Sequence, residues 1–329
     1  MSDNFNSDFQ NQNGNSNATS GNDPANEKNN SNFGRDSKQN KKFEYLILFA
    51  FLLITAVLYV RRNKNEEESL AQENIQYQNI VCLSPSGAEI LSAMGAESLI
   101  VARTDFCDYP SRLEAIPSVG GFSGQTLSAE TILSYKPDLV YGSKGMHDFL
   151  ESPLNEAGVK LYLSDASSIN AVYEEIAVVG EMTGRSTEAA ALVKNMKDSI
   201  QKITEKNKEA AKAKVYYEVW NVPYMTAGKN SFISDLIVIS GGTNIFDDQL
   251  SDYPSVSEET IISRDPEIIL LPNLNGVTVE QVKERSGWEN ISAVKNNKIY
   301  LIDSDLYSRP GPRIVDAISD LTKIFYGEN

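Results

Sequence analysis

The side chains that most often carry out enzymatic chemistry are scarce in this sequence. Its 329 residues include one histidine, His147, and two cysteines, Cys82 and Cys107. A serine–histidine base and a metal site built on several histidines therefore cannot be assembled. Phosphate-binding P-loops and GxSxG elbows are absent, and no spacing singles out a pair of catalytic carboxylates. We predict a protein that is not an enzyme, binds no metal and needs no cofactor.

The two cysteines allow two interpretations. Two thiols are too few for a disulfide scaffold or a zinc site. They are either small buried side chains or, in an extracellular domain, the two halves of a single disulfide bridge, and the sequence leaves both interpretations open.

Two glutamates occupy the same place in two similar stretches of the chain. SAETILSYKPDLVY, from Ser128, and SEETIISRDPEIIL, from Ser257, share six of fourteen residues when aligned without a gap. Each opens with Ser-x-Glu, continues with an apolar helical face, breaks at a proline and ends in an apolar strand. The sequence therefore predicts the same helix–proline–strand unit twice, with Glu130 and Glu259 at equivalent positions.

Strand-like and helix-like stretches alternate around both copies of this unit. Apolar β-rich runs alternating with helices indicate a mainly parallel sheet that is covered on both faces. We expect an α/β fold with two such lobes, an N-terminal lobe over 79–185 and a C-terminal lobe over 214–329. Residues 186–213 lack glycine and proline and are rich in alanine, lysine, glutamate and glutamine. This composition predicts one long backbone helix that joins the lobes.

The N-terminal residues are unlike the rest of the chain. Residues 1–42 contain twelve asparagines and almost no aliphatic side chain, which predicts a disordered tail. Between Lys42 and Arg61 lie eighteen residues whose only charge is Glu44. As a helix they span about 27 Å, just enough to cross a bilayer. We therefore expect an uncleaved transmembrane anchor over 43–60, followed by a linker over 61–78.

The charge of the chain bears on its partners. Basic residues flank the apolar segment in nearly equal number on both sides, so they do not set its orientation. The chain has 30 basic and 45 acidic side chains, of which eight basic and six acidic ones precede residue 65. Residues 65–329 therefore carry 22 basic and 39 acidic side chains, a net charge of −17. Such an acidic globule argues against binding to nucleic acid or to an anionic membrane surface.

Aromatic side chains gather in the loops that follow strand-like stretches in both lobes. They are Phe106, Tyr109, Phe122, Trp220, Tyr224, Tyr253 and Tyr307. Any one of them could cap the core of its own lobe. Open α/β sheets, however, bind ligands in the crevice at the ends of their strands. Together these side chains predict a cleft for a bulky, partly apolar ligand.

Several sequence blocks resemble a known family. IVCLSPSGAEILSAMGA, TDFCDYP, VGGF and the helix–KPDLV unit, followed by TAGKNSFISDLIVISGGTNIFDD, YPSVSEETII and SDLYSRPGPRI, are similar to substrate-binding proteins of ABC importers with a rigid helical backbone. Within that class the cobalamin-binding branch is nearest, and the likeness covers about residues 79–326. It implies a monomer that holds a ligand between two lobes with little hinge motion and delivers it to a permease and its ATPase.

The resemblance also implies roles for individual residues. The ligand contacts carried over from the family are Phe106, Phe122, Tyr253, Asp305 and Arg309, with Tyr109, Trp220 and Tyr224 in neighbouring loops. The wall stays aromatic where Phe106, Phe122 and Tyr253 replace the Tyr and Trp common in cobalamin binders. Glu130 and Glu259 would dock on permease arginines, which pair with carboxylates in a bidentate way. Alternatively, each is a first-turn glutamate favoured by the helix dipole.

The expected function is capture of cobalamin or a related corrinoid. Delivery to a permease places the globular part outside the cell, tethered to the cell membrane by the single-pass anchor. A ferric siderophore or haem is the alternative ligand, and an anionic siderophore favours a basic cleft. Few basic residues lie in the loops, the candidates being Arg103, Lys144, Lys229 and Arg309, so this alternative ranks second. A surface enzyme acting on a bulky substrate is the alternative from another class.

Overall fold

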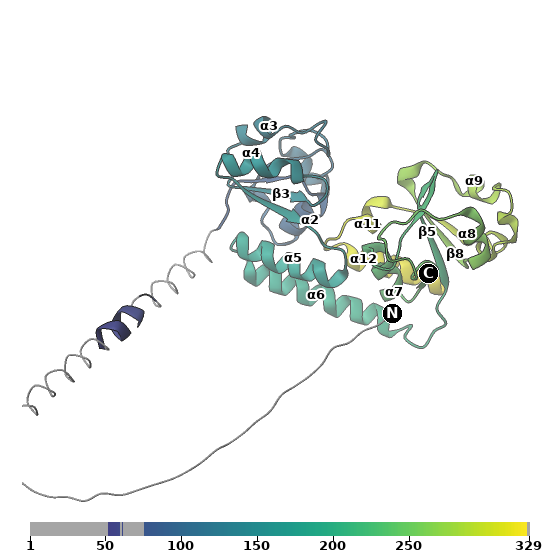
Figure 1. Cartoon of the computed structure of the whole chain (residues 1–329). Helices are drawn as coiled ribbons and strands as arrows, with labels where there is room; N and C mark the ends of the chain where they lie inside the picture. Colours follow the sequence, from purple (N-terminus) through teal and green to yellow (C-terminus); the bar gives the residue numbers. More distant parts are fainter. Residues whose placement is uncertain (1–51, 60, 62–75, 328–329) are drawn as a thin grey trace, which may run out of the picture. The chain divides into compact units, whose positions relative to one another are not determined.

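The computed structural model describes residues 52–59, 61 and 76–327 of the chain, and Figure 1 shows their arrangement as a cartoon. The described residues 76–327 belong to one compact unit. The predicted disordered tail and most of the predicted linker lie outside the described residues. Of the predicted anchor, only 52–59 are described, and they are helical with exposed side chains. No helix among the described residues is both long enough and apolar enough to cross a membrane.

The first lobe is built on a four-stranded parallel sheet in the order β2-β1-β3-β4. Its strands are β1 (Ile80–Cys82), β2 (Ile100–Arg103), β3 (Leu139–Ser143) and β4 (Lys160–Ser164). Its helices are α2 (Pro85–Ala93), α3 (Ala129–Ser134) and α4 (Glu151–Glu156), with 3-10 turns η1 (Glu97–Leu99), η2 (Ser111–Ala115) and η3 (Asp148–Leu150). The start of α2 is fixed by the side chain of Ser84, which accepts from the Gly87 N–H, and by Pro85 in the first turn.

The second lobe is built around β5 (Lys214–Asn221), which pairs in parallel with β8 (Ile268–Pro272), as β8 does with β9 (Ile299–Ile302). The strand β7 (Thr243–Asn244) is also parallel to β5, whereas β6 (Tyr224–Thr226) returns as an antiparallel hairpin. The helices and 3-10 turns are α7 (Phe232–Ile239), α8 (Glu258–Arg264), η4 (Asn273–Asn275), α9 (Val279–Lys283), η5 (Trp288–Asn290), α10 (Ser292–Lys295), α11 (Ser304–Ser308) and α12 (Ile314–Tyr326). The prediction of two α/β lobes with mainly parallel sheets is confirmed.

The repeated sequence unit forms the same local structure in each lobe. In α3 and α8 the capping serines, Ser128 and Ser257, accept from the backbone N–H three residues on, at 3.1 and 3.2 Å. Each helix gives way, just before its proline, to a residue in the left-handed region, Lys136 with φ 51° and Asp265 with φ 45°. A residue before proline avoids the helical region, so the proline sets the end of the helix. The strand that follows is β3 in one lobe and β8 in the other.

Two helices, α5 (Ile169–Met182) and α6 (Ser186–Glu205), lie side by side beneath the lobes (Figure 1). The expected backbone helix over 186–213 is shorter, because residues 206–213 form turns and coil. In α6 the side chains of Ala189, Met196 and Ile200 are buried, whereas 206–213 bury none. Helical propensity alone is weak, and most helices depend on the packing of one face. The helix therefore ends where that packing ends.

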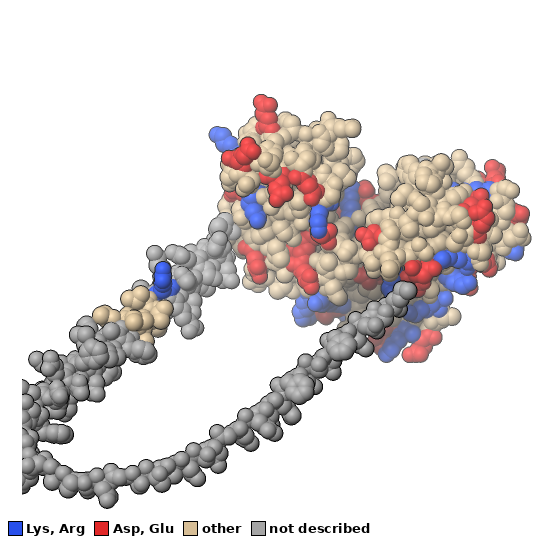
Figure 2. Space-filling model, viewed as in Figure 1, with Lys and Arg blue, Asp and Glu red and all other residues tan. Residues whose placement is uncertain are grey.

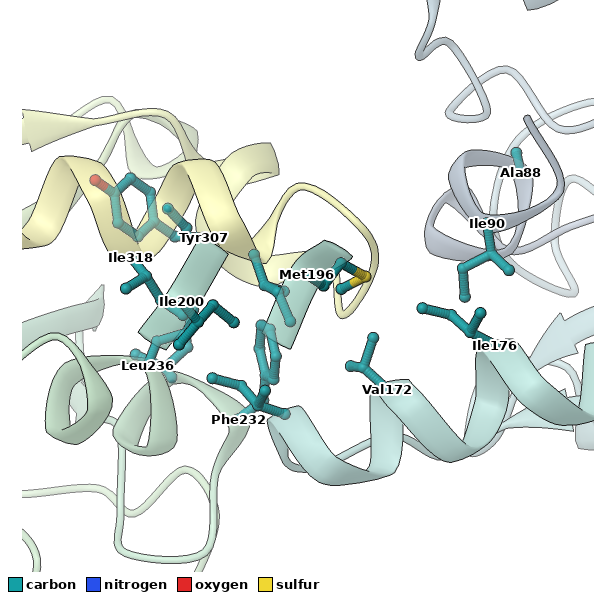
Figure 3. Close-up of a cluster of buried hydrophobic side chains, with 14 of the residues drawn as sticks. Ala88, Ile90, Val172, Ile176, Met196, Ile200, Phe232, Leu236, Tyr307 and Ile318 are labelled. Carbon is teal, nitrogen blue, oxygen red and sulfur yellow. The ribbon is translucent and has the colours of Figure 1, made fainter. Parts of the chain in front are cut away.

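One hydrophobic core runs through both lobes, and Figure 3 shows part of it. It continues from Ile90 of α2 across Ile176 and Val172 of α5 to Phe232 and Leu236 of α7. Each lobe adds a separate cluster on the opposite face of its sheet. A hydrogen bond joins the lobes at the same place, where the carboxylate of Asp235 in α7 accepts from the Ile169 N–H at 2.7 Å. A carboxylate at the N-terminus of α5 is also favoured by the helix dipole.

Candidate ligand-binding cleft

Two adjoining pockets lie where the lobes meet. One, of about 320 Å³, is lined by Phe106, Phe122, Asp305 and Arg309 among others. The second, of about 250 Å³, is lined by side chains that include Lys144, Asp165, Asp252 and Tyr253. Ser86, Ser143 and Pro310 line both pockets, so the two are parts of one cleft between the lobes.

The N-terminus of α2 forms part of the floor of the cleft, since Pro85 lines the first pocket and Ser86 lines both. The helix approaches the sheet very closely here. A Cβ atom at Gly87 would stand 2.6 Å from the ring of Tyr141 in β3, so only glycine fits. The SPSG turn of the sequence therefore places backbone and small hydroxyl groups, rather than large side chains, beneath a ligand.

Aromatic rings form one wall of the first pocket. The rings of Phe106 and Phe122 meet edge to face, with centroids 5.7 Å apart. Phe106 is 51% exposed, which is unusual for a phenylalanine that does not contact another molecule. The ring of Phe122 is supported from behind by the buried imidazole of His147, at 5.2 Å between centroids. The predicted residues Phe106 and Phe122 thus lie together.

Tyr253 lines the second pocket, so it faces the same cleft as Phe122. Its ring is 44% exposed, and burial of its hydroxyl raises the pKa of this tyrosine. Trp220 and Tyr224, by contrast, are not among the residues that line either pocket. The Trp220 indole N–H donates to the Val222 carbonyl at 3.1 Å. The ring of Tyr224 packs on Trp288, at 5.8 Å between centroids.

The position of Tyr224 has a clear physical reason. Its hydroxyl donates to Glu258, at 3.2 Å, and the indole N–H of Trp288 donates to the same carboxylate oxygen at 2.8 Å. These contacts place Tyr224 against the second hydrophobic cluster of its own lobe. Tyr307 is likewise buried in the core, where its hydroxyl is hydrogen-bonded to Asp320.

Arg309 lines the first pocket, but its guanidinium is already paired. It donates to Asp108 at 2.9 Å and forms ion pairs with Asp305 at 2.8 Å and Glu89 at 3.4 Å. Glu89 and Asp108 belong to the first lobe, so Arg309 links the two lobes across the floor of the cleft. A ligand therefore meets Arg309 as part of a neutralised cluster rather than as a free cation.

A second arginine completes this cluster. Arg313 donates to both oxygens of Glu89, at 2.9 Å from Nε and 2.6 Å from Nη2. Its guanidinium also stacks on the ring of Tyr109, at 4.1 Å from the centroid. Tyr109, expected from the sequence to lie near the ligand, thus supports the contact between the lobes. Glu89 is only 3% exposed and holds two arginines of the other lobe. We call Glu89, Asp108, Asp305, Arg309 and Arg313 the interlobe ion cluster.

Carboxylates outnumber cations around the cleft. Lys144 is paired with Asp165, while Asp252 adds a further negative charge to the second pocket. The interlobe ion cluster holds three carboxylates and two guanidinium groups. Among the other candidate cations, Arg103 is buried and donates to backbone carbonyls such as that of Leu113, at 2.8 Å. Figure 2 shows Asp and Glu spread over both lobes on the viewed face, with Lys and Arg gathered mainly along its lower edge.

One more carboxylate lies beneath the second pocket. Glu175 of α5 is buried and accepts hydrogen bonds from the hydroxyls of Tyr141 and Ser164. Ser164 itself lines the pocket. Burial raises the pKa of Glu175, because the loss of water around the carboxylate disfavours its charged form. The floor of the cleft is therefore acidic or neutral in character.

The two glutamates of the repeat lie outside the cleft. Glu130 and Glu259 are exposed in the first turns of α3 and α8. The cysteines, Cys82 and Cys107, are both free and both buried. Burial raises the pKa of the Cys82 thiol well above its usual range. In the part of the chain that the structure describes, no group of three or more His, Cys, Asp or Glu side chains could hold a metal ion.

Sequence patterns pointed to the aromatic residues of the cleft and missed most of its polar ones. Ser86 follows β1 closely and Ser143 is the last residue of β3, and their position at the end of a strand was a usable signal. Asp165 directly follows β4 and carried the same signal, whereas Asp252 lies in the long loop between β7 and α8 and carried none. Glu89 lies within a helix and resembles an ordinary helical glutamate.

Comparisons with known proteins agree with this geometry. The chain is 32% identical to an uncharacterised ABC transporter substrate-binding lipoprotein of Bacillus subtilis, over 76% of this chain and 80% of that protein. It is 29% identical to a cobalamin-binding protein of Halobacterium salinarum, over 76% of this chain and 69% of that protein. A crystal structure from Staphylococcus epidermidis, described as a possible iron-binding, periplasmic solute-binding protein, superposes with a TM-score of 0.69 at 33% identity, over 76% of this chain and 99% of that one.

A family model described as periplasmic binding protein matches residues 80–306, which include both lobes and the helices between them. The chain therefore belongs to the periplasmic binding protein family, whose members bind transported ligands and are not enzymes.

Proposed function

We propose that this protein captures cobalamin or a related corrinoid in the cleft between its lobes and hands it to an ABC importer. The observation that carries the proposal is the character of the cleft. Its wall is aromatic, and each of its two lining cations, Lys144 and Arg309, is already paired with carboxylates. Such a site suits a large ring system whose edge is mainly uncharged.

The alternative ligands of this fold differ in charge. Haem carries two carboxylates, and many ferric siderophores are anions, so both need free cations in the cleft. The corrin ring of cobalamin carries amide groups at its edge, and its positive cobalt balances its phosphate. Amides hydrogen-bond to serine hydroxyls and carboxylates, and Ser86, Ser143 and Asp252 offer these groups. The relative from Halobacterium salinarum is named a cobalamin-binding protein, which supports the same ligand class.

We further propose that the protein is held on the outer face of the cell membrane. The described helical residues 52–59 expose Leu52, Leu53, Ile54, Val57 and Leu58, with exposed fractions between 52 and 63%. A helix that exposes so many large apolar side chains suits a lipid environment. The relative from Bacillus subtilis is named a lipoprotein, and a transmembrane helix would serve the same purpose as a lipid. A tether keeps the binder at high effective concentration near its permease.

Glu130 and Glu259 are the proposed docking points for the permease. They are exposed, and they occupy the same place in two copies of one structural unit, each in a different lobe. Two carboxylates presented in this way allow a two-point contact with basic side chains of a partner.

The ligand is tested by calorimetry on the full chain in detergent micelles. We expect binding of cyanocobalamin and no comparable binding of hemin or a ferric hydroxamate. Phe122→Ala and Tyr253→Ala should each weaken cyanocobalamin binding by about 1–3 kcal/mol, as other buried aromatic contacts do. Trp220→Ala is the matched control, since this side chain is 45% exposed but lies outside both pockets. If the chain instead binds hemin or the ferric hydroxamate tightly and does not bind cyanocobalamin, the proposed corrinoid ligand is refuted and the alternative ligand takes its place.

Docking is tested by uptake of labelled cyanocobalamin into cells that carry the chain and its importer. The double variant Glu130→Lys and Glu259→Lys should keep the affinity for cyanocobalamin and lose uptake. Glu151→Lys with Glu280→Lys is the matched control, because these residues are also exposed first-turn glutamates, one in each lobe. If the control loses uptake to the same extent, Glu130 and Glu259 have no special role.

A further inference from the structure

The only histidine of the chain lies directly behind the aromatic wall of the cleft. His147 precedes η3 and is fully buried, with an exposed fraction of 0%. Its neighbours are the end of β3 on one side and the loop that carries Phe122 on the other. It lines neither pocket, so it does not contact a ligand in the cleft itself.

Two hydrogen bonds define the protonation state of this imidazole. The backbone N–H of Ser143 donates to Nδ1 at 2.8 Å. Since Nδ1 accepts, the proton of the neutral ring must be on Nε2, which lies 3.1 Å from the Phe122 carbonyl oxygen and donates to it. A neutral ring can make both bonds at once, and burial favours the neutral form by lowering the pKa of His147.

Both partners of His147 are parts of the cleft. Phe122 lines the first pocket, and Ser143 lines both. The imidazole ring also meets the Phe122 ring edge to face, so it contacts the backbone and the side chain of the same residue. Packing leaves little freedom here, because a Cβ atom at Gly142 would stand 3.0 Å from the His147 Cβ. The imidazole thus joins two separate segments of the cleft wall.

We propose that His147 is a positioning residue, which fixes Phe122 and Ser143 in the geometry that holds the ligand and releases them when the imidazole is protonated. The proposal rests on the proposed ligand-binding function of the cleft. A protonated imidazole has two donors and no acceptor, so Nδ1–H would face the Ser143 N–H and their hydrogen bond would be lost. Ligand affinity should therefore fall in acid.

Few charges act on this imidazole. Asp148 follows it in the chain and is exposed, and its negative charge raises the pKa of His147 slightly against the larger effect of burial. Lys144, three residues earlier, is held by Asp165. The segment around Phe122, from Gly120 to Thr126, carries no ionisable side chain. Among the ionisable side chains named here, His147 is the one that is hydrogen-bonded to both Ser143 and Phe122.

A first experiment needs no ligand. The full chain, purified in micelles through a tag without histidine, is uniformly labelled with ¹⁵N, and its one histidine gives a single imidazole in the nitrogen spectrum. We expect the Nε2–H tautomer at neutral pH, titration below the ordinary histidine pKa of 6.5, and Ser143 and Phe122 amide shifts that follow it. The Nδ1–H tautomer, or amide shifts independent of the titration, would overturn the proposal even if cyanocobalamin does not bind.

A second experiment measures cyanocobalamin affinity against pH. His147→Asn keeps an acceptor near Nδ1, and His147→Gln keeps a donor near Nε2, so each retains one of the two bonds. We expect each to weaken binding about tenfold at neutral pH, the effect of one lost hydrogen bond, and to remove the acid loss seen in the original chain. Urea midpoints of the variants, measured in parallel, report the effect on folding.

These experiments distinguish a histidine that positions the cleft wall from one that only stabilises the fold. If His147 served the stability of the fold alone, the variants would lower the urea midpoint while the folded protein kept its affinity and its pH profile. That outcome would overturn the proposal. Failure of the unaltered chain to bind cyanocobalamin would instead refute the proposed ligand, and the nitrogen spectrum would still decide the role of His147.

Discussion

Glu89 offers the sharpest test of how the lobes are held together. Its carboxylate is 3% exposed and accepts from Nε and Nη2 of Arg313, with Arg309 nearby at 3.4 Å. Glu89→Gln keeps the shape of the side chain and one acceptor oxygen but removes the charge. Arg309 keeps Asp108 and Asp305, whereas Arg313 keeps its stacking on Tyr109 and a weaker attraction to the charge of Asp303. The variant therefore leaves one largely buried guanidinium without a carboxylate in direct contact.

The expected loss of stability follows from that unpaired guanidinium. Removing one partner of a buried ion pair usually destabilises a protein by about 3–5 kcal/mol. Because the amide oxygen introduced by Glu89→Gln would still accept one hydrogen bond, we expect the lower end, about 3 kcal/mol. For a domain of this size, 3 kcal/mol corresponds to a fall in the unfolding midpoint of about 6–12 °C. Thermal unfolding of the full chain in micelles, followed by circular dichroism, measures that fall.

Asp198→Asn is the matched control. Asp198 and Lys194 lie 2.6 Å apart, as do Glu89 and Arg313, and both variants change a carboxylate to its amide. The carboxylates differ in exposure, with 47% of the Asp198 side chain accessible against 2% for Glu89. We expect no measurable shift for the exposed pair. Equal shifts in both variants would refute the reasoning, and Arg313→Met added to Glu89→Gln should recover part of the loss.

Two further predictions concern buried titratable groups. The pKa of Glu175 is raised above its ordinary 4.5, so the folded state holds this proton more tightly than the unfolded state, and stability is lost as the pH rises through the raised pKa. Glu175→Gln should therefore gain urea stability relative to the unaltered chain between pH 4.5 and 7.5, and a constant difference would contradict this. The thiols of Cys82 and Cys107 should not react with a disulfide reagent until the protein unfolds, because both are buried and free. Fast reaction of one thiol in the folded protein would show that its segment opens.

The sequence predicted the repeated unit well because its determinants are local. A capping serine, an acidic first turn and a proline lie within ten residues of each other in both copies. Each of these residues acts on its own neighbours, so their spacing alone predicts a short helix followed by a strand. The structure confirms the helix and the strand and adds a left-handed residue before each proline, which the spacing did not predict. The alternation of such units also predicted two parallel sheets.

The features that sequence reasoning missed depend on contacts between distant residues. Glu89 and Arg313 are 224 positions apart, and no local pattern marks Glu89 as the partner of two arginines. Tyr224 was predicted to lie in a loop like the cleft aromatics, but it begins β6, and its contacts with Trp288 and Glu258 hold it against the core. The length of α6 was overestimated for a related reason. Its composition favours a helix well beyond Glu205, but the packing that stabilises it does not continue.

The way the lobes are joined bears on how a ligand is released. The continuous core, the interlobe ion cluster and the bond from Ile169 to Asp235 would all be disrupted if the lobes swung apart. Opening would expose apolar side chains of the core that both lobes share, and this cost disfavours an open form. The cleft is therefore formed before the ligand arrives, in line with the small hinge motion that the family resemblance implied. A cleft that rarely opens by itself needs a partner to release its ligand. We expect that the free energy of binding to the permease drives this opening.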